Sequence, residues 1–313
     1  MKSPESPRFL RIENTMSPTS FFLSFSLYSE LIKSKQTFLL LYTAIFAYLI
    51  SSWESRFMLT DFIGLMVGLF FAISGSTLLN MYIDRDIDAL MERTKNRPLP
   101  SGRIPASTVL KHGTLFTTGG ILAIGIFIDV LTMTVVFLGV FLDVVVYSLW
   151  LKRRTRFSII FGGVAGGLPA VAGRTAAIGT LDIIALLLGF FVLCWIPLHI
   201  LTLALIPKNL VGYKNANIPM WPVICGQVQT IRVITLSALT SSLIMVFTGL
   251  MLNIQTIILL PFILFSIFII SNTAVNLKHP STERTFRIFK LGSLFMLFAF
   301  LWLFIGVIFS SIF

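Results

Sequence analysis

Charged residues are scarce in this sequence. Only 12% of its 313 residues are Asp, Glu, Lys or Arg, whereas a soluble domain carries roughly a quarter. Hydrophobic residues make up 56% of the chain. So little charge excludes an ordinary soluble domain, and most of the surface is expected to face lipid.

Cysteine is almost missing, and internal repeats are not found. The two cysteines, Cys194 and Cys225, lie in or near apolar runs, so they imply no disulfide framework and are expected to be small buried residues. The chain shows no internal repeat and no pair of Gly- or Pro-broken helices in matching halves. Those features would point to a transporter, so their absence disfavours one.

Acidic residues are few. The chain has 13 Asp and Glu against 24 Lys and Arg, for a formal net charge of +11, and none of the acids lies between Asp182 and Glu283. A basic balance can indicate nucleic acid binding. Here we expect the excess charge to lie at one membrane face and to attract anionic lipid headgroups, so the bilayer is the expected partner and nucleic acid is not.

Long apolar runs dominate the rest of the chain. A helix that crosses a membrane needs roughly 20 mostly apolar residues. Nine runs approach that length: 36–52, 61–82, 112–128, 132–150, 158–176, 182–206, 231–251, 254–273 and 290–311. The fifth is rich in Gly and Ala, which allow close backbone approach in membranes, so it is predicted to be central.

The positive charges are sorted between the two sides of this arrangement. Of the 24 Lys and Arg residues, 22 fall on alternate connections, and the other connections keep only Arg56 and Arg174. By the positive-inside rule, the amino terminus is predicted to be cytoplasmic and the carboxyl terminus to lie outside. Residues 1–24 are predicted to be a flexible tail, and 25–313 a single polytopic membrane domain.

One segment places acids at the end of an apolar run. "NMYIDRDIDALMERTKNRPLP" begins at Asn80, and Asn80, Asp84 and Asp88 are spaced i, i+4, i+8, so on a helix they share a face. Stacked acids repel one another, and Mg²⁺ bound by their oxygens would remove the repulsion. Ionisable groups at a membrane helix end are costly and usually functional.

Arginines follow the acids closely. Arg93 and Arg97 carry guanidinium forks that match phosphate oxygens. Oxygen ligands followed by arginines predict a metal-bound diphosphate at the cytoplasmic mouth of a helical bundle. A charged cytoplasmic loop held by internal ion pairs is the alternative interpretation.

The same segment resembles the signature of the haem-modifying branch of the UbiA superfamily of intramembrane prenyltransferases. That signature is Asn-x₃-Asp-x₃-Asp with a further Asp between the two acids, followed by Met-x-Arg-Thr-x₂-Arg-Pro-Leu, and all of it is present here. The segments "ELIKSKQTFLLL", "VYSLWLKRRT", "FGGVAGGLPAVAG" and "NANIPMWPV" are also similar to family segments. The resemblance covers about residues 28–310.

The resemblance implies a fold and a reaction. The fold is an all-α bundle of about nine transmembrane helices with a cytoplasmic-facing active-site cavity, in the plasma membrane. The reaction is transfer of a farnesyl group from farnesyl diphosphate to a vinyl group of haem B, with addition of water. Haem A synthase or terminal-oxidase assembly factors are the implied protein partners.

The resemblance also implies roles for individual residues. Mg²⁺ would lie on Asn80, Asp84 and Asp88, which with Arg93 and Arg97 form the implied catalytic set. Other residues are expected to contact the diphosphate: Lys33, Lys35, Tyr147, Lys152, Arg153, Lys208, Tyr213 and Lys214. His199 and Trp195 are expected to contact haem.

The chain departs from the family pattern in the second half. "WIPLHI" keeps Trp195 and His199 but replaces the Gln, Pro and Phe that usually accompany them, and Gly212 stands where an acid usually precedes the tyrosine. A second carboxylate cluster is therefore missing. Lys208 and Lys214 are expected to hold diphosphate directly there, and a second metal is put in doubt.

Two alternatives remain open at this stage. A related prenyltransferase could act on an aromatic quinone precursor or a glycerol phosphate lipid, although the long Met-x-Arg-Thr-x₂-Arg-Pro-Leu match argues against it. A non-enzymatic haem carrier or assembly factor would need haem-binding residues but no acids at Asp84 and Asp88.

Overall fold

The computed structural model describes residues 25–312, and every regular element in that range is a helix. The predicted tail, residues 1–24, lies outside the described residues. Nine helices within the described range are long and apolar enough to cross a membrane, as the sequence predicted. They are α2 (Ser34–Glu54), α3 (Leu59–Ile83), α5 (Ala106–Phe127), α6 (Val130–Val140) continuing as η2 (Phe141–Leu151), α7 (Ser158–Ile178), α8 (Ile183–Leu205), α10 (Trp221–Met251), α11 (Thr256–Lys278) and α12 (Thr282–Ile312).

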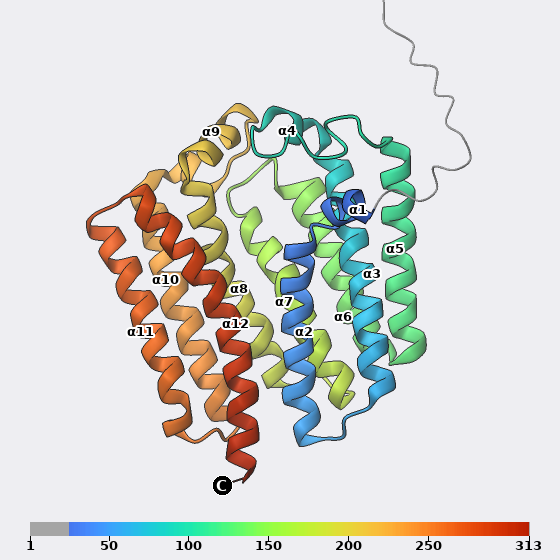
Figure 1. Cartoon of the computed structure of the whole chain (residues 1–313), viewed down its shortest axis with the longest axis vertical. Coiled ribbons are helices and arrows are strands. Elements are labelled where there is room, and N and C mark those ends of the chain that lie inside the picture. Colours follow the sequence, from blue (N-terminus) through green and yellow to red (C-terminus); the bar gives the residue numbers. More distant parts are fainter. Residues whose placement is uncertain (1–24, 313) are drawn as a thin grey trace, which may run out of the picture.

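Three short helices lie together at one end of the bundle (Figure 1). They are α1 (Phe25–Leu31), α4 (Arg85–Leu90) and α9 (Pro207–Asn215), and the chain's carboxyl end lies at the opposite end of the bundle. The end that carries α1, α4 and α9 is the one that the charge distribution predicts to be cytoplasmic.

Three membrane helices begin earlier than the apolar runs suggested: α5 at Ala106, α10 at Trp221 and α12 at Thr282. The first turns of α5 and α12 contain polar or charged residues, and in α10 Gln227, Gln229 and Arg232 follow the first turn. Such residues end an apolar run but not a helix, because polar side chains are satisfied at the membrane surface. α10 also passes through Gly226, whose φ of 75° is a conformation that glycine adopts without strain.

Helix α7 lies in the middle of the bundle (Figure 1) and packs against α2, α8, α6 and η2. In its most apolar window 67% of the residues are buried, the highest share among the nine spans. Its glycines and alanines permit this close packing, so the predicted central position is confirmed.

The backbones of helices α3 and α5 come into close contact at glycine residues. A Cβ atom added at Gly120 would lie 2.4 Å from the backbone N of Ala72 and 2.5 Å from the backbone O of Gly68. A Cβ added at Gly75 would lie 2.4 Å from the backbone N of Thr117. Such distances leave no room for a methyl group, so this interface requires glycine.

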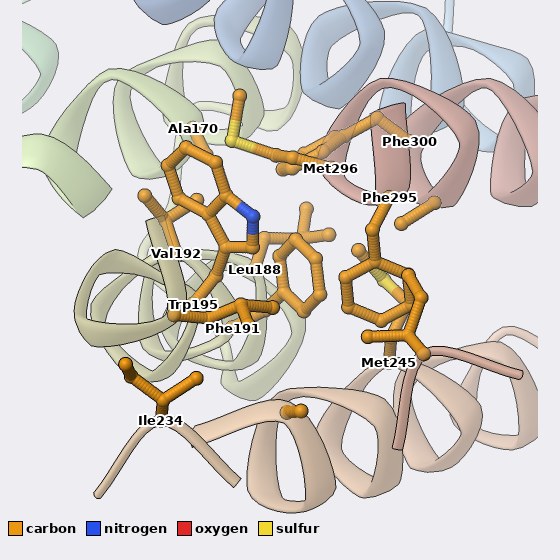
Figure 2. Packing of buried hydrophobic residues seen from close by; sticks show 14 of the residues in the cluster. Ala170, Leu188, Phe191, Val192, Trp195, Ile234, Met245, Phe295, Met296 and Phe300 are labelled. Carbon is orange, nitrogen blue, oxygen red and sulfur yellow. The ribbon is translucent and has the colours of Figure 1, made fainter. Parts of the chain in front are cut away.

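Aromatic and aliphatic side chains pack together in the largest core cluster, to which α8, α10 and α12 contribute (Figure 2). Phe191 of α8 packs against Phe295 of α12 in a tilted arrangement and against Phe300 of α12 edge to face, at centroid distances of 5.9 and 5.7 Å. The indole Nε1 of Trp195 donates to the backbone O of Gly292 at 2.7 Å. Trp195 is only 4% exposed, so this bond ties α8 to α12 inside the bundle.

Arg174, one of the two basic residues on the side predicted to face away from the cytoplasm, is buried within α7. Arg174 is 4% exposed, and its Nη2 donates to Asp182 Oδ2 at 2.7 Å, while its Nη1 donates to Ser51 Oγ at 3.2 Å. Asp182 in turn accepts from the backbone N of Ala185 at the start of α8. The charge is therefore paired inside the protein, as a buried charge requires.

We expect Gly120→Ala to destabilise the protein by about 1–3 kcal/mol, because the added methyl group would overlap the backbone of α3. Gly119→Ala is the matched control: no atom lies within 4 Å of a Cβ added at Gly119, and alanine favours a helix more than glycine does. Thermal unfolding in detergent measures both. Equal melting temperatures for the two variants would contradict the close packing of α3 and α5.

Candidate active site

The acidic row forms where α3 ends and α4 begins. The backbone N of Asp84 donates to Asn80 O at 2.9 Å, and the backbone N of Asp88 donates to Asp84 O at 2.8 Å. Helical hydrogen bonding therefore continues through the break at Asp84, and the three residues keep the predicted helical spacing. Asp84 and Asp88 are only 6% and 5% exposed.

Each buried carboxylate has its own cation. Lys152 Nζ forms an ion pair with Asp84 Oδ2, and Arg97 Nη1 donates to Asp88 Oδ2 at 2.6 Å. Burial alone would lower the pKa of Lys152, but Tyr147 and Asp84 raise it above its ordinary value. The ammonium group therefore stays charged. The ion pairs of the alternative interpretation are present, although they are largely buried and involve the acidic row itself.

The row also contacts an acid that the sequence analysis did not single out. Asp143 Oδ2 accepts from Asn80 Nδ2 at 2.6 Å and from Ser76 Oγ at 2.5 Å. Asp143 lies in the fourth membrane span. An acid inside an apolar run is itself a signal of function, and it could have identified Asp143 from the sequence.

A π-helix brings Asp143 and Lys152 to the same side. Nine positions separate them, which is about two and a half turns of α-helix. In a π-helix each hydrogen bond spans five residues, so the same distance is about two turns. The backbone N of Lys152 donates to Tyr147 O at 2.8 Å, a bond across five residues, and both side chains reach α3.

Two oxygens of the row are suited to a metal ion. Asn80 Oδ1 and Asp84 Oδ1 are buried and make no hydrogen bond. An unpaired buried acceptor costs about 1–3 kcal/mol, and a hard cation would satisfy both atoms. Among residues 25–312, no three His, Cys, Asp or Glu side chains gather into a metal-binding group. These donors therefore fit Mg²⁺, which takes one or two carboxylates and completes its shell with phosphate oxygens and water.

Lys33 lies close to these cations. It joins α1 to α2 with a φ of 46°, and with Lys35 it lines a surface cavity of ≈ 380 Å³. Its pKa is lowered to about 8, first by burial and then by the positive charges of Arg97 and Lys152. Lys33 is therefore a third cation near the acidic row, and its contact with diphosphate stays a prediction.

Other residues predicted to bind diphosphate point elsewhere. Arg153 pairs with Asp86 rather than with the buried acids: its Nη1 and Nη2 each donate to that carboxylate at 2.7 Å. This pairing lowers the pKa of Asp86, and both side chains are largely exposed. Lys35 and Arg93 are also exposed, so their roles stay predictions.

Helix α9 covers the end of the acidic segment. Tyr213 is buried in the same cluster as Met91 and Ile87, whereas Lys208 and Lys214 are exposed. A Cβ added at Gly212 would lie 3.3 Å from the Sδ-bound methyl Cε of Met91. The glycine thus allows α9 to pack closely on the segment after α4, where the family usually has an acid.

His199 and Trp195, predicted for haem, stack on each other. Their ring centroids are 4.8 Å apart, and Phe289 covers the other face of His199 at 4.7 Å. Ser293 Oγ lies 3.2 Å from His199 Nδ1. Any metal bound by His199 would therefore approach its ring edge at Nε2.

Similarity to known proteins agrees with this geometry. A model of the UbiA prenyltransferase family matches residues 40–304. Over 263 residues the chain is 36% identical to a protein of Korarchaeum cryptofilum named protoheme IX farnesyltransferase. The aligned region covers 84% of this chain and 87% of that protein.

Solved structures share the fold. One, from work on digeranylgeranylglyceryl phosphate synthase in membranes, has a TM-score of 0.74 at 19% identity and covers 90% of this chain and 98% of that chain. A UbiA homologue from Archaeoglobus fulgidus, bound to DMAPP and Mg²⁺, has a TM-score of 0.62 at 17% identity, with coverage of 88% and 98%.

We expect the affinity for inorganic pyrophosphate to fall as pH rises through about 8, where Lys33 of the empty site loses its proton. The bound anion stabilises the ammonium form, so binding above that pH requires proton uptake. Lys33→Met should bind more weakly near neutral pH and lack this part of the pH dependence. Titration calorimetry across the range measures it, with Lys111→Met as the control, because Lys111 is exposed and is not among the residues predicted to bind diphosphate. Equal pH profiles for Lys33→Met and the natural protein would exclude Lys33 from the anion site.

Proposed function

The chain belongs to the UbiA prenyltransferase family, and we propose that it transfers a farnesyl group from farnesyl diphosphate to a vinyl group of haem B, with addition of water, to give haem O. The relative from Korarchaeum cryptofilum, matched over 84% of this chain, carries the name of that activity. The observation that carries the proposal is the row formed by half-buried Asn80 and buried Asp84 and Asp88, with two unpaired oxygens and a cation on each acid.

The row supports loss of a diphosphate group. When the C1–O bond of the prenyl diphosphate breaks, its electron pair stays on the diphosphate and an allylic cation forms. Bound Mg²⁺ would supply positive charge at the phosphate oxygens. Lys152 pairs with Asp84, and Arg97 pairs with Asp88. The donor groups of both cations can turn from carboxylate to phosphate as negative charge develops on the diphosphate.

The haem vinyl group supplies the electron pair that the farnesyl cation lacks. The vinyl π-electrons of haem form the new bond to the farnesyl carbon, which leaves a cation next to the porphyrin ring. Water adds to that cation and releases a proton. The apolar bundle keeps water from the farnesyl cation before the vinyl group attacks it.

We place the haem near α8 and α12. His199 has both ring faces covered and its Nδ1 near Ser293, so it would reach haem iron through Nε2. Trp195 donates to Gly292 O and is buried, and it supports the position of His199 by stacking. The proposed setting is the plasma membrane with the amino terminus in the cytoplasm, and haem A synthase or terminal-oxidase assembly factors as partners.

The purified protein in detergent is expected to convert haem B, farnesyl diphosphate and Mg²⁺ into a haem whose mass has gained one farnesyl group and one water. Asp84→Asn should lower the rate at least about a hundredfold, because a metal ligand contributes several kcal/mol to charge stabilisation. Asp86→Asn is the matched control, since Asp86 is exposed and pairs with Arg153 outside the row.

The product is identified by mass spectrometry. Unchanged haem from a preparation that binds both ligands would overturn the haem acceptor. Prenylation of an aromatic quinone precursor or a glycerol phosphate lipid under the same conditions would identify the alternative enzymes. Haem binding with no transfer to any acceptor would support a carrier.

A further inference from the structure

We propose that Asp143 is a positioning residue that holds the amide of Asn80 with its oxygen directed to the metal site. The inference rests on the proposed function, because it concerns the Mg²⁺ that the row would bind. It adds a residue outside the Asn-x₃-Asp-x₃-Asp motif, from a different membrane helix.

The chemistry of the two side chains determines which end of the amide faces Asp143. An ionised carboxylate can only accept hydrogen bonds, so the Asn80 atom 2.6 Å from Asp143 Oδ2 is the donor Nδ2. The other end of the same amide is then Oδ1, and that oxygen is buried without a partner. The bond to Asp143 therefore selects the orientation that presents an acceptor, rather than two N–H groups, to a cation.

Asp143 is itself held in place. Ser76 Oγ, one helical turn before Asn80 on α3, donates to the same Oδ2 atom at 2.5 Å. Two donors from one face of α3 thus converge on a single carboxylate oxygen. A carboxylate in a membrane span is costly, and here its role would be to fix the ligand end of the motif.

The π-helix explains why Asp143 can act together with Lys152. In an α-helix the nine-position separation would turn the two side chains to opposite faces, and only one could reach α3. In η2 both do, so Asp143 orients Asn80 while Lys152 neutralises Asp84. π-Helical segments occur often at functional sites, and this one aligns two groups with the motif.

The test compares Asp143→Leu with Asp143→Asn in the full-length protein reconstituted in lipid nanodiscs. Leucine has the same branched shape, with larger methyl groups in place of the two oxygens, and it offers no acceptor, so Asn80 is free to rotate. Asparagine keeps an acceptor oxygen without the charge. Mn²⁺ binding in the presence of inorganic pyrophosphate is measured by electron paramagnetic resonance. The affinity for Mn²⁺ should fall at least about tenfold in Asp143→Leu and should stay within about threefold of the natural protein's affinity in Asp143→Asn.

A second background separates positioning from general damage to the fold. In Asn80→Asp both ends of the side chain are oxygens, so orientation no longer matters. In that background the new carboxylate also faces the carboxylate of Asp143, so adding Asp143→Leu removes a repulsion and should leave Mn²⁺ affinity equal or higher. A merely structural role would weaken binding equally in both backgrounds. Asp143→Ala is measured beside Asp143→Leu, with melting temperatures, so that a misfolded leucine variant does not decide the result.

Three outcomes would overturn the proposal. The first is that Asp143→Leu and Asp143→Ala both bind Mn²⁺ as tightly as the natural protein, and the second is that Asp143→Asn loses as much Mn²⁺ affinity as Asp143→Leu. The third is that Asp143→Leu lowers Mn²⁺ affinity as much in the Asn80→Asp background as in the natural protein. The Mn²⁺ measurement uses neither haem nor farnesyl diphosphate. A failed haem assay together with the expected Mn²⁺ results would therefore reject the haem acceptor and keep the role of Asp143.

Discussion

The pairing of two polar rows inside an apolar bundle is the interaction on which the site depends. α3 contributes Ser76, Asn80 and, at its end, Asp84, while η2 contributes Asp143 and the residue after its end is Lys152. Leaving such a group unpaired in a buried position costs about 1–3 kcal/mol or more. The bonds between the rows therefore set the rotation and register of η2 against α3, and with them the position of every group that would bind the metal.

Charge balance follows from this pairing. Asp84 and Asp88 are neutralised by Lys152 and Arg97, and Asp86 by Arg153 at the surface. A divalent cation alone would compete with these basic groups, and a diphosphate alone would compete with the carboxylates. When both arrive together, carboxylates can turn to the metal and basic groups to phosphate without leaving a buried charge unpaired. At the proposed site, binding of the two ligands would therefore be coupled by electrostatics.

The bundle holds these rows through close backbone packing. Gly68 and Gly75 of α3 lie against α5, and the small residues of α7 lie against α2 and α8. In a membrane such packing replaces much of the hydrophobic driving force between helices. On the other side, His199 lies between aromatic rings of α8 and α12, so the predicted haem contact lies in a closely packed part of the protein.

The number of spans, the helical spacing of Asn80, Asp84 and Asp88, and the central place of α7 could all be predicted from the sequence. They depend on hydropathy, periodicity and small-residue content, which are local properties of the chain. Only the tertiary structure decided that Lys152 turns inward to Asp84 while its neighbour Arg153 pairs with exposed Asp86. It also decided the contact of Asp143 with Asn80, because a π-helical turn and the rotation of one helix against another arise from packing between distant segments, which local periodicity does not record.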